Sequence, residues 1–237
     1  MHKVVAAFPV LPGKDPRAIA DMLRSRPDEW RESRRRQGVH VERAYEQVTP
    51  MGTFVIAYIE SDRPFAEVNA AVATSDLAID KEFAAMIKDV HGVDITVPPP
   101  GEPPETIGDW VDENVTERKA GLAFVAPIQP GAEERGRAFA DEAYVQRRGD
   151  HATSRRALGV THETVCLNPT PAGSVICVYL EGDDPVDGNR RFAESRSDYD
   201  VWFKERCTTV FAPDIDFNQP LPPITEIFDS ERLPIAR

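Results

Sequence analysis

A tyrosine and a glutamate recur, two positions apart, in two similar stretches of this sequence. The stretches are TPMGTFVIAYIE (residues 49–60) and TPAGSVICVYLE (residues 170–181), so Tyr58 and Glu60 correspond to Tyr179 and Glu181. Side chains two positions apart on a strand point to the same face of a sheet. A phenol beside a carboxyl group can orient a substrate and exchange protons with it. The spacing therefore indicates a small-molecule site on one face of a sheet.

Strand alternation separates this polar face from an apolar one. In the first stretch, the residues on the apolar face are Val55, Ala57 and Ile59. We expect helices to cover the apolar face, and we expect the face with the tyrosine and the glutamate to line a cavity. The second stretch repeats both faces and adds a thiol, Cys177, to the polar one.

The T-P-x-G segment between the strands sets which residues lie opposite one another. Proline favours a type I turn, and the glycine can supply the left-handed residue of a bulge. A three-residue turn of this kind places Glu42 opposite Glu60, and by the same count Glu163 lies opposite Glu181. Facing carboxylates repel, so either one carboxyl group holds a proton or arginines neutralise the pair. The nearest arginines in the predicted topology are Arg34, Arg35, Arg155 and Arg156.

A two-residue turn is the alternative, and it changes which side chains share a face. It places His162 opposite Glu181, where an imidazole and a carboxylate form an acid/base pair. Because this register leaves the turn glycine without a role, the three-residue turn is our expectation.

Two histidines distinguish the second half of the chain from the first: His151 stands in the position of Trp30, and His162 in that of Val41. A histidine that faces a cavity can move protons near neutral pH, whereas one on an exposed helix surface has no such role. The competing interpretation is that the tyrosines and glutamates are scaffold, since both halves keep them. We predict catalytic roles for His162, His151, Glu181 and Tyr179. We predict substrate contacts for Tyr58, Glu60, Glu42, Glu163, Cys177 and Arg155.

The similarity between the halves continues outside these stretches. FPVLPG and SRRRQGV are matched, about 120 residues later, by APIQPG and SRRALGV. Each half is typical of a β-α-β-β-α-β unit, the ferredoxin-like pattern, with helices on one sheet face. We predict repeat 1 over residues 1–97, with Asp94–Val97 as its last strand, and repeat 2 over residues 119–218. Residues 98–118 form a proline-rich linker with a short helix, and residues 219–237 a C-terminal tail.

The motifs S-R-R-x-x-G-[VI] and T-P-x-G-x-x-x-x-x-Y-[LI]-E resemble a poorly characterised family of small actinobacterial-type proteins. The resemblance implies an α+β fold in which two tandem ferredoxin-like repeats pack sheet to sheet, as an intramolecular version of the dimeric α/β-barrel superfamily. That superfamily includes cofactor-free monooxygenases, cyclases and isomerases, and haem proteins of the chlorite dismutase type.

Charge and motifs exclude several classes of function. A net charge of −12 disfavours nucleic acid and anionic membranes as partners. Metal-ligand spacings and nucleotide-binding glycine loops do not occur, so we expect no metal and no cofactor. We expect a cytoplasmic monomer or homodimer.

We predict a cofactor-free small-molecule enzyme of the cyclase, isomerase or monooxygenase type, working in a cavity between the two sheets. The alternatives are a haem protein with His151 or His162 as the iron ligand, and a non-catalytic protein that binds a small ligand.

Overall fold

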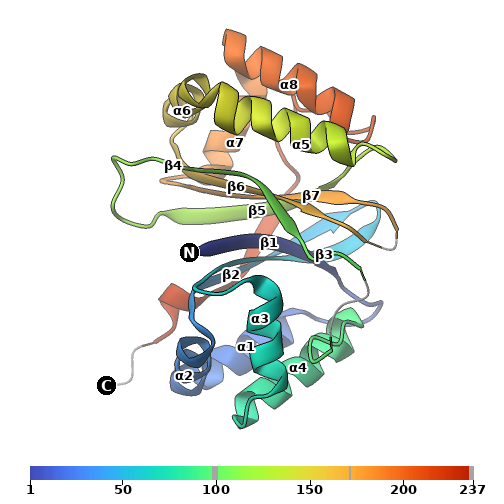
Figure 1. Cartoon of the computed structure of the whole chain (residues 1–237), viewed down its shortest axis with the longest axis vertical. Coiled ribbons are helices and arrows are strands. Elements are labelled where there is room, and N and C mark those ends of the chain that lie inside the picture. The colour runs from blue at the N-terminus through green and yellow to red at the C-terminus, as the bar shows by residue number, and fades with distance from the viewer. Residues whose placement is uncertain (98–100, 171, 235–237) are drawn as a thin grey trace. The chain divides into compact units, whose positions relative to one another are not determined.

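The computed structural model describes residues 1–97, 101–170 and 172–234, and the chain divides into two units. Unit 1 comprises Met1–Pro103 and Thr225–Arg237, and unit 2 comprises Pro104–Ile224. Each unit has a four-stranded antiparallel sheet with helices on one face of it (Figure 1). The mixed α+β class is therefore confirmed, whereas the tandem duplication and the packing of one sheet on the other stay predictions.

Unit 1 has the strand order β1-β3-β2-β8. Its helices turn their apolar residues, such as Ile19, Leu23 and Phe83, toward the sheet. Gly38, with a φ of 71°, ends the second helix in the left-handed conformation that favours glycine. The strands are β1 (His2–Pro9), β2 (Val39–Thr49), β3 (Gly52–Ser61) and β8 (Ile224–Asp229). The helices are α1 (Arg17–Ser25), α2 (Pro27–Gln37), α3 (Phe65–Ala73) and α4 (Ala78–His91).

Unit 2 has the order β4-β6-β7-β5, which is the same arrangement written from the other edge. Its core is rich in aromatic side chains, among them Trp110, Tyr144 and Phe203. The strands are β4 (Glu105–Val111), β5 (Ala120–Pro127), β6 (Val160–Asn168) and β7 (Val175–Gly182). The helices are α5 (Glu133–Asp141), the π-helix η1 (Glu142–Gln146), α6 (Arg148–Ala157), α7 (Pro185–Glu194) and α8 (Asp198–Val210). In unit 1, a 3-10 turn, η2 (Ser230–Arg232), follows β8.

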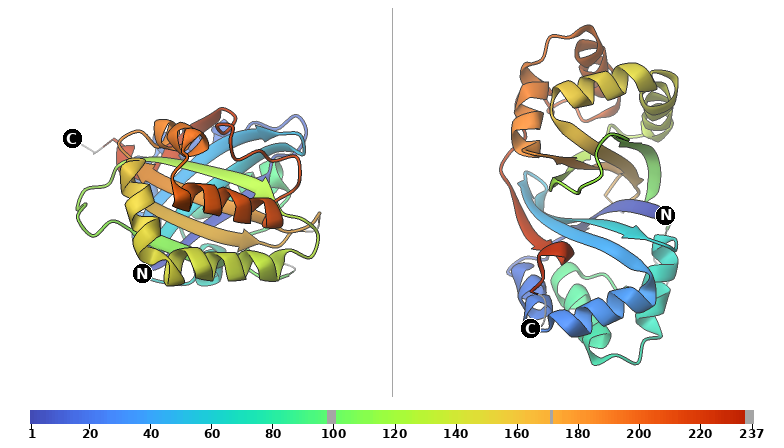
Figure 2. Two further views of the ribbon diagram at one scale, coloured as in Figure 1. Left: turned by 90° about the horizontal axis from the view of Figure 1, so that it is seen from above. Right: turned by 90° about the vertical axis from the view of Figure 1, so that its left-hand side faces the viewer.

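The edge strands differ from our expectation. Asp94–Val97 is not a strand, and the predicted short helix after the linker is instead the strand β4, which pairs with β6 in unit 2. The predicted C-terminal tail contains β8, which lies beside β2 in unit 1 (Figure 2). Trp110 and Phe228 on these strands are buried in the cores of their units. Packing of these side chains against the sheet stabilises each segment as an edge strand.

The hairpin has a two-residue turn, so the expected register is wrong and the alternative is correct. Thr49 pairs with Gly52, and its hydroxyl accepts a hydrogen bond from the Met51 amide. Gly52 takes a φ of 124° within the ladder, so the glycine is needed without a bulge. Since a shift of one residue exchanges faces, the predicted carboxylate pairs do not form. Glu42 lies opposite Ile59.

Candidate functional site

The predicted site residues divide between the two faces of the sheets. Both glutamates of β2 and β6, Glu42 and Glu163, lie on the helix-covered face with Arg155 and His151. The helix-free face of unit 1 carries Tyr58 and Glu60, which are joined by a hydrogen bond from the Tyr58 hydroxyl. The helix-free face of unit 2 carries His162, Cys177, Tyr179 and Glu181. The structure therefore does not bring these side chains into one constellation.

His162 forms the centre of a polar network on the helix-free face of unit 2. Its Nδ1 lies 3.7 Å from Oε1 of Glu181, directly opposite on β7. On its other side, Nε2 lies 2.9 Å from the Thr164 hydroxyl and 3.4 Å from Oδ1 of Asp109. An imidazole flanked by two carboxylates has the arrangement of a general acid/base centre.

Glu181 is held in its ionised form by its surroundings. Burial opposes ionisation, but the neighbouring His162 ring, the hydrogen bond from Tyr179 and the charge of Arg118 lower the pKa of Glu181 to about 2. The Tyr179 hydroxyl donates to Glu181 Oε1 over 2.7 Å, and Nη1 of Arg118 donates to the same oxygen over 2.9 Å. Glu181 thus lies beside the His162 ring as a carboxylate, and the Tyr179 hydroxyl holds Glu181 in place.

Glu163 is the centre of a second network, under the helices of unit 2. It accepts hydrogen bonds from Nε and Nη2 of Arg155. His151 Nε2 lies 3.1 Å from Glu163 Oε2, and His151 Nδ1 lies 2.9 Å from the Tyr199 hydroxyl. Burial would raise the pKa of Glu163, but the charge of Arg155 and the adjacent His151 ring hold it far below its usual range.

These contacts decide between the interpretations of His151. Its side chain is fully buried, so the alternative of an exposed helix residue is wrong. Burial and the neighbouring Arg155 charge lower the pKa of His151, which favours the neutral ring. Both ring nitrogens face protein groups, so neither is directed toward a haem iron. The facing carboxylate pairs that arginines were expected to neutralise do not form; Arg155 and, less tightly, Arg34 instead pair with the single buried glutamates Glu163 and Glu42.

Unit 1 has a polar centre that corresponds to the Arg155–Glu163 network, and it consists of Arg34, Glu42 and Asp80 at longer distances. Arg34 Nη1 lies 3.7 Å from Glu42 Oε2, and Arg34 Nη2 lies 3.8 Å from Asp80 Oδ1. Both distances exceed those of hydrogen bonds. The Arg34 guanidinium stacks 3.7 Å above the ring of Trp30, the residue that replaces His151. Burial raises the pKa of Glu42, although the charge of Arg34 opposes that shift.

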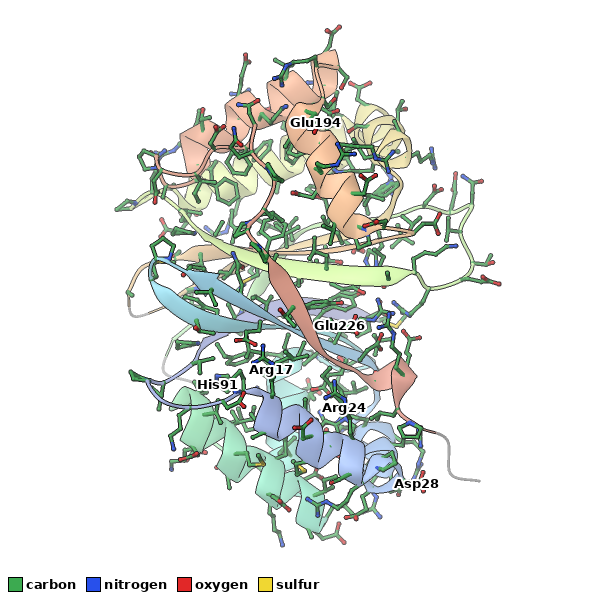
Figure 3. The ribbon with its side chains drawn as sticks, turned by 180° about the vertical axis from the view of Figure 1, so that it is seen from behind. Arg17, Arg24, Asp28, His91, Glu194 and Glu226 are labelled. Carbon is green, nitrogen blue, oxygen red and sulfur yellow. The ribbon has the colours of Figure 1, made fainter. Side chains whose placement is uncertain are left out.

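Arg34 and Glu42 line a cavity between the sheet and the helices of unit 1. It has about 800 Å³ of empty space, part of it open to solvent. Its floor includes Ala44 and Ala57, which are only half-buried although they lie in the middle of the sheet. α1, which carries Arg17 and Arg24, and the end of α4 at His91 border it (Figure 3). A mostly apolar hollow with a few convergent polar groups is the usual form of a ligand site.

Sequence reasoning missed the residues that fix both arginines. Ser33 donates a hydrogen bond to Asp80, and Ser154 donates one to Asp200. Each aspartate is buried in the first turn of α4 or α8. The S-R-R motif was the available signal for the serines, but no local pattern marks the aspartates.

Within residues 1–97, 101–170 and 172–234, no group of His, Cys, Asp or Glu side chains has the arrangement of a metal site. In the same ranges, no helix is long and apolar enough to span a membrane.

Comparisons with known proteins place the two-sheet α+β fold. A family model described as a family of unknown function (DUF6176) matches residues 1–99. No curated protein matches the chain. The crystal structure of an anthrone oxidase-like protein is similar, with a TM-score of 0.51 at 10% identity, over 94% of this chain and 90% of that one. A candidate monooxygenase from Fusobacterium nucleatum subsp. nucleatum has a TM-score of 0.48 at 12% identity, over 94% and 89%. At these identities the likeness concerns the fold.

Proposed function

We propose that this protein is a small-molecule enzyme that performs cofactor-free acid/base chemistry in the unit 1 cavity. The observation that carries the proposal is the buried Arg34–Glu42 pair in the wall of a mostly apolar hollow. A buried carboxyl group with a raised pKa, next to a cation and inside a cavity, is a common feature of active sites.

Glu42 is the proton-transfer residue in this proposal. Its raised pKa lets it hold a proton closer to neutral pH than an exposed glutamate does, so it can donate to a substrate atom and take a proton back. Arg34 orients the polar end of the substrate and stabilises negative charge that develops there. Moving a proton between two carbons gives an isomerase, and forming a ring bond gives a cyclase. A monooxygenase reaction would use dioxygen as co-substrate.

The similarity of fold to an anthrone oxidase-like protein supports an enzyme that acts on a small molecule. The likeness carries no information about residues at this identity. The reaction type therefore rests on Glu42 and Arg34.

The test is turnover of a panel of mostly apolar metabolites in air, followed by mass spectrometry. We expect Glu42→Gln to lower turnover by about 10²-fold or more while substrate still binds. Ala44→Val with Ala57→Val introduces the side chains found at the matching positions of unit 2, Val165 and Val178, and should abolish binding. Full turnover in the filled variant would refute the site. Binding without turnover in the wild type would instead indicate the non-catalytic ligand-binding protein.

A second candidate centre is His162 with Glu181, Tyr179 and Asp109. The observation in its favour is the imidazole held between two carboxylates. His162→Gln distinguishes the two centres: loss of turnover in this variant, with Glu42→Gln still active, would assign the chemistry to His162. We expect the opposite result.

A further inference from the structure

The guanidinium of Arg34 has hydrogen-bonding capacity that its protein neighbours do not use. It is 94% buried by residue, with only 6% exposed, yet its Nε has no hydrogen-bond partner among the described residues. The hydrogen bond that it makes within the described ranges is a long one, from Nη2 to Ser33 at 3.4 Å. A buried cation without good partners is costly, so such a group indicates a site for a charged partner.

The matching arginine of unit 2 shows what a satisfied guanidinium looks like. Arg155 Nε and Nη2 both donate to Glu163, and the carboxylate also contacts His151. Glu42 makes no comparable fork with Arg34, and its Oε2 has no hydrogen-bond partner in the described chain. In unit 1, Nε of Arg34 therefore has no hydrogen-bond partner among the described residues, Nη2 has only the long bond to Ser33, and Arg34 lines the cavity.

The orientation of Arg34 is fixed before any ligand arrives. The guanidinium lies 3.7 Å above Trp30 and 5.4 Å from the ring centroid of Phe83. Stacking on aromatic faces holds the guanidinium plane, and a fixed fork of donors matches a carboxylate or another planar oxyanion. The surrounding walls are apolar, for example Ile19, Val68 and Phe83.

We infer that the ligand of the unit 1 cavity is an apolar molecule with one acidic end, a carboxylic acid or a phenol, bound as its anion by Arg34. This inference rests on the proposed site in unit 1. The raised pKa of Glu42 agrees with it, because a protonated Glu42 does not compete with the ligand anion for Arg34. The apolar remainder of the ligand fills the space above Ala44 and Ala57.

The experiment is calorimetric titration of the full-length protein with matched acid and amide probes. The probes are benzoic, 2-naphthoic and decanoic acid, each paired with its own primary amide. We expect an acid to bind about tenfold or more tightly than its amide, which is the scale of a charge-assisted hydrogen bond. Glu42→Gln should keep this preference, since a carboxamide resembles the neutral carboxyl group.

Arg34→Gln should remove the preference for the acid, and Arg35→Gln is its matched control. Arg35 is the next residue on α2, is exposed and pairs with Glu32, so its substitution removes the same charge without touching the cavity. Arg34→Lys covers the case in which Arg34→Gln does not fold, and it should bind the acid more weakly than the wild type, because a lysine lacks the fork.

The outcomes separate the inference from the proposed function. Equal affinity for acids and amides, or an equal loss in Arg34→Gln and Arg35→Gln, would overturn the inference and leave the cavity as a ligand site. Failure of every probe to bind the wild type would overturn both.

Discussion

The helix-covered faces of the two units share the S-R-R motif but differ in how the arginine contacts its glutamate. In unit 2, Arg155 closes onto Glu163 through two hydrogen bonds, and His151 completes the contact. In unit 1, the corresponding Arg34 and Glu42 are 3.7 Å apart and border a cavity. The polar centre is therefore not a site by itself. It becomes a candidate site in unit 1, where the arginine and the glutamate are too far apart for a hydrogen bond and a cavity lies beside them.

The space differs because the side chains around it differ in size. The floor positions are Ala44 and Ala57 in unit 1, whereas the matching residues of unit 2 are buried valines. Leu23 of α1 is matched by Tyr144, whose ring packs so closely on β4 that a Cβ at Gly108 would meet it at 2.5 Å. Small residues in one unit and large ones in the other thus separate a hollow core from a filled one.

The largest expected effect comes from breaking the polar centres. Glu163→Gln leaves Arg155 buried without its carboxylate and should lower the free energy of unfolding by about 3–5 kcal/mol. Glu42→Gln should change it by less than about 1.5 kcal/mol, because its ion pair is long and makes no hydrogen bond. Urea unfolding of both variants measures the difference. Equal losses would remove the distinction between the two centres.

Changing the floor of each core should give a smaller difference. Val178→Ala opens space in a packed core and should cost about 2 kcal/mol. Ala57→Val adds the same groups where space exists and should change the free energy of unfolding by no more than about 1 kcal/mol. Thermal unfolding of the pair provides the measurement, and a strongly destabilising Ala57→Val would show that the cavity collapses in solution.

The smallest effect is a difference in the direction of pH dependence. The lowered pKa of Glu163 stabilises the fold above the unfolded value of about 4.3, and this contribution is lost as the pH falls through the folded value. The deficit of Glu163→Gln should therefore shrink in acid. The raised pKa of Glu42 has the opposite sign, since its contribution is present at low pH and is lost as the pH rises. Glu42→Gln should therefore gain on the wild type as the pH rises, and parallel profiles would contradict both assignments.

Periodicity was sufficient to predict the strands of the central hairpins and their helix-covered face, although not the edge strands β4 and β8. Val55, Ala57 and Ile59 lie under the helices as alternation predicts, because alternation depends only on backbone geometry. The turn was mispredicted because Gly52 accommodates its positive φ inside the ladder, which composition cannot distinguish from a bulge. That shift of one residue placed Glu42 on the helix-covered face, where it lines the unit 1 cavity, rather than on the face with Tyr58 and Glu60.

The cavity and the edge strands were beyond sequence reasoning for a different reason. A hollow arises from the summed volume of side chains on five or more elements, as at Leu23, Ala44 and Ala57, and no local pattern records that sum. Pairing of β8 with β2 joins segments far apart in the chain, and their spacing carries no signal of the contact.

The position of β8 in the chain has a consequence for synthesis. Unit 2 is one continuous segment and can complete its fold as soon as Ile224 has left the ribosome, whereas unit 1 must wait for Thr225 onward to supply its edge strand. Ile227 and Phe228 of that late strand also line the hollow. The unit whose N-terminal part is translated first is thus completed last, and the lining of its hollow is complete only after these residues have been made.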